Sequence, residues 1–146
     1  MMKKFFFRLE TLLKLHKTRE RRTQRELAYM EQKQTSLQAK SVSLEKQMAA
    51  LIKEITIKRK AKEYGLEETY SQLLHYLNTS FSQTQEVLSL QDKQITEKKE
   101  QLKKMVQGRK IIEKIKENHY TDWRVEIEQR EESLLDEKTA NHSPFK

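Results

Sequence analysis

Hydrophobic residues recur along the first half of the chain at alternating steps of three and four. This is the spacing of a helix that buries one narrow stripe against another helix. The apolar stripe consists of Leu9, Leu13, Leu27, Met30, Leu37, Leu44, Met48, Leu51 and Ile55. Polar residues fill its other positions, namely His16, Glu20, Thr23, Gln34 and Ser41. Because polar seam residues fix register at a cost in stability, the pattern predicts a helix over about residues 5–63 that pairs within the chain and does not form a strong homodimer.

The second half of the chain repeats the same period. Its stripe consists of Tyr70, Leu74, Leu77, Phe81, Leu88, Ile95, Leu102, Met105 and Ile112. We expect a second helix over about residues 67–138. At roughly 1.5 Å per residue it would reach about 110 Å, against about 85 Å for the first, so its end should extend past the start of the first helix. Gly108 lies inside this helix, where it could allow bending.

A turn is expected over about residues 64–66. Basic residues precede it at the negative end of the first helix dipole, and Gly65 is a candidate for the left-handed residue that follows a helix. Glu67 and Glu68 suit the positive end of a new helix. An unbroken helix through Gly65 would cost only about 1 kcal/mol relative to Ala and is the alternative.

These elements predict an all-α fold, a long antiparallel two-helix coiled coil or helical hairpin. We expect a single domain over residues 1–138. The aperiodic residues 139–146 should form a disordered tail.

Composition agrees with a hairpin of this kind. Only 35% of the residues are hydrophobic while 36% are charged, which cannot fill a globular core. Residues 1–65 hold 17 basic and 7 acidic side chains, a net charge of +10, whereas residues 66–146 hold 13 basic and 15 acidic, a net charge of −2. Antiparallel pairing of the two halves therefore costs less repulsion than self-pairing of the first half.

The sequence predicts that the protein is not an enzyme. It has no cysteine and two glycines, so thiolate sites and glycine-rich phosphate loops are excluded. Four histidines are scattered along the chain, at His16, His75, His119 and His142. We expect no catalytic residues, cofactor or metal. No run approaches the roughly 18 apolar residues of a membrane span, so a cytoplasmic protein without a transmembrane segment is expected.

Binding to other proteins is the function that the remaining features favour. The densest basic cluster comprises Lys17, Arg19, Arg21, Arg22 and Arg25. A solvated helix face, an acidic protein partner and nucleic acid are the alternatives for it, in that order, since no aromatic residue is interleaved for base stacking. At least one of Phe5, Phe6 and Phe7 should pack against the second helix or a partner. Leu73 and Tyr76 lie off the stripe and suggest either a docking face or local packing near the turn.

Together these features resemble the FliJ family, with virulence secretion relatives as second choice. Residues 7–17 are similar to the family's opening of an aromatic residue, Arg, Leu and a leucine-rich basic turn. Gly65 and Leu66 followed by Tyr70, Leu73 and Leu77 resemble the stretch after the turn. Residues 109–116 are similar to the family's basic lead-in to its last part, and residues 131–137 to its acidic close.

The resemblance implies a stalk of the flagellar type III export apparatus that sits in the pore of the hexameric export ATPase. It would promote assembly and activity of that ATPase and couple it to the membrane export gate. The implied ATPase-ring binding residues are Phe7, Leu9, Leu12, Leu13, Arg19, Arg22, Arg124, Glu128 and Glu131. The implied binding residues for the cytoplasmic domain of the export gate are Leu73, Tyr76, Leu77 and Phe81.

Further partners and alternatives follow from the same resemblance. Family members are also expected to bind export chaperones and to lie at the cytoplasmic face of the inner membrane with the export apparatus. The chain alone should be a monomer, without specific nucleic-acid binding. A generic coiled-coil tether or dimerisation protein is the competing interpretation, and self-association at micromolar concentration would favour it.

Overall fold

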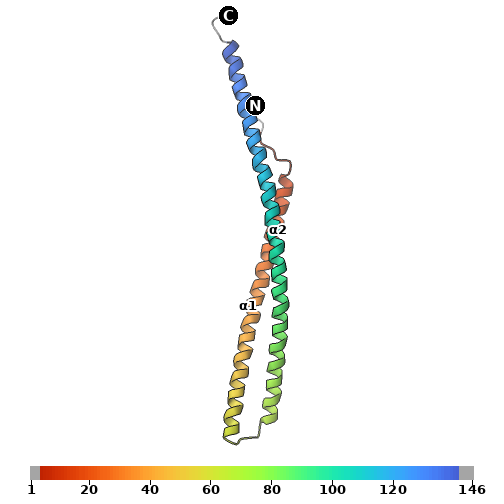
Figure 1. Cartoon of the computed structure of the whole chain (residues 1–146), viewed down its shortest axis with the longest axis vertical. Helices are drawn as coiled ribbons and strands as arrows, with labels where there is room; N and C mark the ends of the chain where they lie inside the picture. Colours follow the sequence, from red (N-terminus) through yellow and green to blue (C-terminus); the bar gives the residue numbers. More distant parts are fainter. Residues whose placement is uncertain (1–3, 142–146) are drawn as a thin grey trace. The chain divides into compact units, whose positions relative to one another are not determined.

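The structure, a computed structural model, describes residues 4–141. It contains two long helices, α1 (Glu10–Lys60) and α2 (Glu67–Asn141), packed together as a hairpin (Figure 1). The prediction of an all-α helical hairpin with a longer second helix is confirmed. The predicted tail differs, because α2 includes residues 139–141, and residues 142–146 lie outside the described part.

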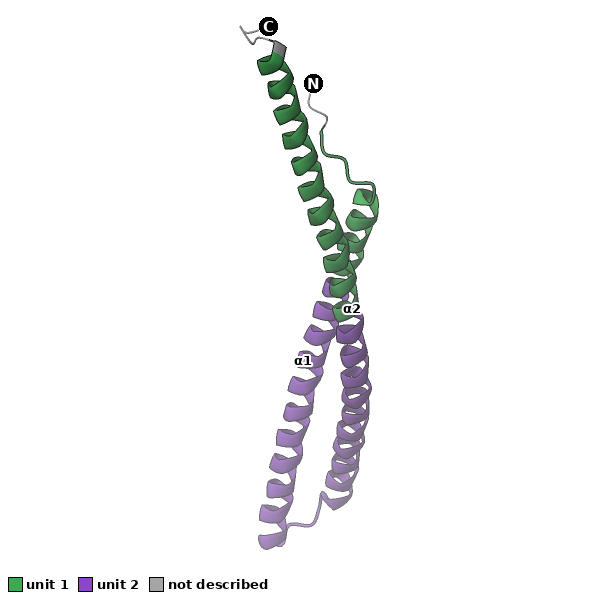
Figure 2. Cartoon of the chain, turned by 45° about the horizontal axis from the view of Figure 1, so that its top comes forward, with its two compact units in different colours: residues 1–22, 102–146 green, residues 23–101 purple. Residues whose placement is uncertain are grey.

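The chain divides into two compact units (Figure 2). One, called here the terminal unit, comprises residues 1–22 and 102–146; the other, the turn unit, comprises residues 23–101. Each contains part of α1 and part of α2, side by side. The turn unit also contains the connection between the helices.

Helix α1 begins later than the sequence predicts. Residues 4–9 are not helical, and the Glu10 amide donates a backbone hydrogen bond to the Phe7 carbonyl at 3.1 Å. The Phe7 side chain is buried, only 4% exposed, beside Leu13 and Ile112. Burying an aromatic ring of this size outweighs the small gain of one more exposed helical turn.

The end of α1 corrects the prediction for Gly65. The left-handed residue is Lys62, whose φ is 59°, and neither glycine has a positive φ. The Glu63 amide donates to the Lys58 carbonyl at 3.0 Å, and the Lys62 amide donates to the Arg59 carbonyl at 3.1 Å. This pair of bonds is the Schellman motif, with lysine in the position that glycine usually takes. The connection therefore starts at residue 61, three residues before the predicted turn.

The predicted stripes are the interface between the helices. Every stripe position named for α1 and α2, including the polar ones, is buried or half-buried. In the turn unit Leu44, Leu51 and Leu77 form the core. The partly buried residues packed around them are Met48, Ile55, Tyr70, Leu74 and Phe81.

Cross-helix polar contacts establish the antiparallel direction. In the turn unit the amide of Gln34 donates to Asp92, the amide of Gln85 donates to Ser41 at 2.6 Å, and the hydroxyl of Tyr70 donates to Glu54 at 3.0 Å. The partner's number falls as the α1 number rises. Gln34 and Ser41, two polar positions of the stripe, thus have hydrogen-bond partners across the interface, which favours one register.

Candidate functional site

All nine residues that the resemblance implies for ATPase binding lie in the terminal unit. The structure does not leave all of them accessible. Phe7 and Leu13 are 4% and 1% exposed, because they form the core between α1 and α2 with Ile112. Leu9 packs against the same core and is half-buried. These three side chains hold the two helices together and offer a partner little surface.

Leu12, Arg19 and Arg22 point away from that core and are exposed. Leu12 keeps 40% of its surface, although it is adjacent to the fully buried Leu13. Two further apolar residues nearby were not singled out from the sequence, Leu15 at 43% and Ile111 at 62% exposed. Both lie off the stripe, and the same off-stripe signal that identified Leu73 and Tyr76 could have found them.

A partly buried ion-pair cluster crosses the helices in this unit. Arg109 of α2 donates to Glu20 of α1 at 2.5 Å and to Glu113 at 2.9 Å, and Lys17 lies 4.0 Å from Glu113. Glu20 is only 8% exposed. Its hydrogen bond, followed by that of Glu113, raises the pKa of Arg109 above its ordinary value. The guanidinium therefore remains charged, and the cluster sets the register of the terminal unit.

An aromatic cluster packs the N-terminal segment, residues 4–9, against α2. Phe5 meets Tyr120 edge to face with ring centroids 5.2 Å apart and lies 5.8 Å from Trp123. Phe7 meets the His119 ring at 5.7 Å. The expectation that at least one of the three phenylalanines packs against the second helix is confirmed, while Phe6 is 85% exposed. Among the described residues, these ring contacts extend along α2 as far as Trp123.

Beyond the cluster α2 continues alone within its unit (Figure 2). Every residue from Glu128 to Ala140 is exposed. Arg124 lies 3.8 Å from Glu128, and Arg130 donates to Glu126 at 2.8 Å, both one helical turn apart. Such exposed pairs contribute only about 0.3–0.5 kcal/mol, so they can exchange partners easily. Arg124, Glu128 and Glu131 are thus accessible, with Leu134 and Leu135 exposed beside them.

The four residues implied for gate binding lie in the turn unit and differ in exposure. Leu73 and Tyr76 are 45% and 65% exposed, whereas Leu77 is 5% exposed. Leu77 belongs to the core with Leu44 and Leu51, and Phe81 packs against that core. The burial of Leu77 follows from its stripe position. Of the four, Leu73 and Tyr76 are the exposed residues that a partner could contact here.

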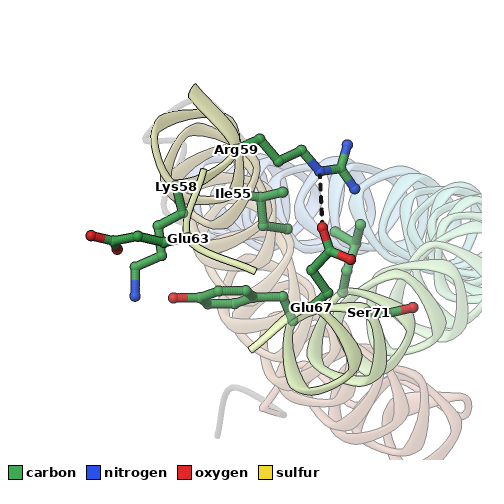
Figure 3. Close-up of a pocket in the computed structure, with 8 residues that line it drawn as sticks. Ile55, Lys58, Arg59, Glu63, Glu67 and Ser71 are labelled. Carbon is green, nitrogen blue, oxygen red and sulfur yellow. Dashed lines mark ion pairs between the residues drawn. The ribbon is translucent and has the colours of Figure 1, made fainter. Parts of the chain in front are cut away.

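A small cavity of about 120 Å³ lies where the helices meet the connection (Figure 3). Lys58 lies over the Tyr70 ring at 5.3 Å, and the Tyr70 hydroxyl raises the pKa of Lys58. Arg59 lies 4.0 Å from Glu67. Because ligand pockets usually measure roughly 300–1,000 Å³, this cavity is small for a bound molecule.

Two searches of the described residues concern other kinds of site. Between residues 4 and 141 no group of three or more His, Asp or Glu side chains is arranged to hold a metal ion. In the same part of the chain neither helix has a stretch long and apolar enough to cross a membrane.

Comparison with known proteins identifies a family. No curated protein and no solved structure matches the chain. The family model described as the flagellar FliJ protein matches residues 5–143, which is nearly the whole chain. This match confirms the suspected resemblance and implies a coiled-coil protein related to flagellar export, from a structural, chaperone-like family and not an enzyme family. The chain belongs to the FliJ family.

Proposed function

We propose that this chain is the stalk of the flagellar type III export apparatus. It stands in the pore of the hexameric export ATPase, promotes assembly and activity of the ring, and couples it to the membrane export gate. The observation that carries the proposal is a difference in burial between two parts of α2. Its paired part buries an apolar stripe against α1, while every residue from 128 to 140 is exposed.

The terminal unit supplies the surface for the ATPase. Leu12, Arg19 and Arg22 contribute from α1, and Arg124, Glu128 and Glu131 contribute from α2. Phe7, Leu9 and Leu13 support this surface from beneath. A protein that binds some states of a ring more tightly than others shifts their populations, so faster ATP turnover needs no chemistry on this chain.

The turn unit supplies the surface for the gate. Leu73 and Tyr76 are one helical turn apart and share a face of α2, and the buried Leu77 and half-buried Phe81 fix the helix beneath them. With the two surfaces in different units, the ATPase and the gate can be bound at the same time. The chain then acts at the cytoplasmic face of the inner membrane. Export chaperones are further partners in this proposal.

ATPase stimulation tests the first assignment. Arg19→Glu with Arg22→Glu should raise the chain concentration that gives half-maximal stimulation of the hexameric export ATPase by about tenfold or more, because both charges would then oppose an acidic partner. Lys14→Glu with Arg21→Glu makes the same charge change at exposed positions on another side of α1 and should change it less than threefold. If both variants raised this concentration equally, the change in net charge alone would explain the effect.

Gate binding tests the second assignment. Leu73→Ala with Tyr76→Ala should weaken binding to the cytoplasmic domain of the gate about tenfold, because exposed apolar anchors are lost without opening a cavity in the core. Val87→Ala with Leu90→Ala changes two exposed apolar residues farther along α2 and is the matched control. Retained affinity in the Leu73 and Tyr76 variant would remove this surface from the proposal.

The competing function is a generic tether that dimerises. The stripes of both helices are filled within one chain, which favours a monomer. Light scattering at micromolar concentration should give a mass near 17.6 kDa. Twice that mass would favour the tether.

A further inference from the structure

The N-terminal segment presents its three phenylalanines in two directions. Phe5 is half-buried and Phe7 is 4% exposed, whereas Phe6 between them is 85% exposed. Side chains that alternate in this way are typical of an extended segment that lies on a surface with one face inward and one outward. Phe6 is more exposed than any other large apolar side chain in the described part of the chain. Its ring therefore contributes little to holding the helices together.

The position of Phe6 is fixed by its two neighbours. Phe5 meets the Tyr120 ring with centroids 5.2 Å apart, and Phe7 meets the His119 ring at 5.7 Å. Both contacts lie within the terminal unit, where the N-terminal segment runs beside α2 (Figure 2). Because both neighbours are held, the backbone at Phe6 has little freedom left to lose when a partner binds. Preorganisation of this kind raises affinity.

Two cations flank Phe6 along the chain. Lys4 and Arg8 are both exposed, and neither has an ion pair within residues 4–141. The first carboxylate in the sequence, that of Glu10, is already paired with Lys116 at 2.7 Å. Carboxylates of a partner are therefore the groups that would complement Lys4 and Arg8.

We propose that Phe6 is the anchor by which the N-terminal segment docks on a protein. Its ring enters an apolar pocket of the partner, and carboxylates at the rim of that pocket meet Lys4 and Arg8. This inference rests on the proposed function, in which the pocket belongs to the hexameric export ATPase. Aromatic side chains that fill pockets inside a polar rim carry much of the binding energy of protein interfaces. The resemblance implies Phe7 for this contact, but Phe7 is buried and the exposed ring is that of Phe6.

An anionic bilayer is a different partner for an aromatic ring with two cations beside it. Segments that bind membranes bury a whole apolar face, usually with several Trp, Phe or Leu side chains. Here Phe5 and Phe7 pack against α2, so Phe6 is the one ring of the three that faces outward. A single ring has too little apolar area for stable anchoring, because even a myristoyl chain binds membranes only marginally. A pocket in a protein is the better match.

Stimulation of the export ATPase by the full chain tests the anchor. Phe6→Ser should raise the chain concentration that gives half-maximal stimulation about tenfold, and Phe6→Trp should keep it within about threefold of the unmodified value. Tyr64→Ser removes another exposed aromatic ring, 59% exposed in the turn unit, and should change this concentration less than about twofold.

The charged rim predicts a dependence on salt. Added salt should raise the half-maximal concentration for the unmodified chain, because it screens the contact of Lys4 and Arg8 with carboxylates. Lys4→Gln with Arg8→Gln should make this rise smaller. Lys103→Gln with Lys104→Gln makes the same change of net charge at exposed positions of α2 and should leave the rise unchanged. An equal reduction in both double variants would remove the carboxylate rim from the proposal.

Trp123, the single tryptophan of the chain, reports whether the N-terminal segment stays in place. The Phe5 ring lies 5.8 Å from it. Phe6→Ser should leave the Trp123 emission maximum unchanged, so that weaker stimulation is due to the missing ring and not to a displaced segment. An emission maximum that shifts in Phe6→Ser would mean that Phe6 holds the segment on α2, and would overturn its role as an anchor.

The outcomes separate this inference from the proposed function. No stimulation by the unmodified chain would overturn the proposed function and this inference with it. Stimulation that Phe6→Ser retains in full would overturn the inference alone. Cosedimentation with vesicles of phosphatidylcholine and phosphatidylglycerol examines the other partner. Vesicle binding that Phe6→Ser loses, combined with unchanged ATPase stimulation, would assign the ring to lipid and also overturn the inference.

Discussion

Lys62 ends α1 with a φ of 59°, a backbone conformation that a residue with a Cβ adopts at a cost. Gly65, three residues later, has no positive φ and no atom within 4 Å of the place where a Cβ would stand. The left-handed conformation is thus adopted by Lys62, whereas Gly65, which could adopt it without strain, does not. Stability at the turn should respond to substitution accordingly.

Lys62→Gly should stabilise the chain by about 1 kcal/mol, because it removes the strain of the left-handed residue. Urea unfolding followed by circular dichroism measures this. Lys62→Ala removes the same charge and keeps a Cβ, so it should give no such gain.

Gly65→Ala should also stabilise the chain, by about 0.4–1 kcal/mol, because alanine leaves the unfolded chain fewer conformations to lose on folding. Destabilisation by Gly65→Ala would restore the sequence prediction of a left-handed glycine.

Sequence reasoning reached the seam but not the exact ends of α1. The stripe was predictable because burial follows the 3.5-residue period, and this includes polar members such as Glu20 and Ser41. The start at Glu10 was missed because Phe7, which is buried, belongs to a non-helical segment. The end of α1 at Lys60 was missed because a Schellman motif with lysine as its left-handed residue has no composition signal.

At the scale of the helix pair, polar contacts determine which residues face each other. Leucine contacts tolerate many alignments, but Glu20 meets Arg109 in only one. Glu20 is buried and Arg109 has a second partner in Glu113, so the two members of the pair are not equivalent. The sequence identified Glu20 as a polar seam residue without revealing its partner, because the partner lies 89 positions away.

Arg109→Leu should destabilise the chain more than Glu20→Leu. The first leaves the Glu20 carboxylate buried without its hydrogen bond, whereas the second leaves Arg109 paired with Glu113. The double variant should be more stable than Arg109→Leu alone, because no buried charge remains unpaired. Urea unfolding of the unmodified chain, the two single variants and the double variant gives the double-mutant cycle. Additive losses would mean that the contact carries no coupling.

The Glu10 and Lys116 pair predicts a dependence on pH. The hydrogen bond with Lys116 lowers the pKa of Glu10 below its ordinary value of 4.5. A carboxylate with a lowered folded-state pKa stabilises the fold above that ordinary value, and the stabilisation is lost as pH falls through the lowered one. Lys116→Gln should therefore flatten the fall of the urea midpoint below about pH 4.5. Lys114→Gln removes a charge from an exposed pair within α2 and is the control; an unchanged slope in Lys116→Gln would contradict the linkage.

At the scale of the whole chain, function depends on which surface meets which partner. The family was recognisable because motifs in the right order cover most of the sequence, and the match over residues 5–143 agrees. The exposure of the residues that the resemblance implies for binding was only partly predictable. The resemblance groups Leu12 with Leu13 and Leu73 with Leu77, whereas the stripe separates them, since Leu13 and Leu77 are buried in the seam and Leu12 and Leu73 are exposed.

Thiol labelling tests the proposed polarity of the chain most directly. The natural sequence has no cysteine, so Ile111→Cys and Tyr76→Cys each introduce a single reactive group at a position more than 60% exposed. Saturating export ATPase should slow maleimide labelling at position 111 about tenfold and leave position 76 unchanged, while the gate domain should do the reverse. Protection of position 76 by the ATPase, with position 111 still labelled at its free rate, would contradict the stalk arrangement.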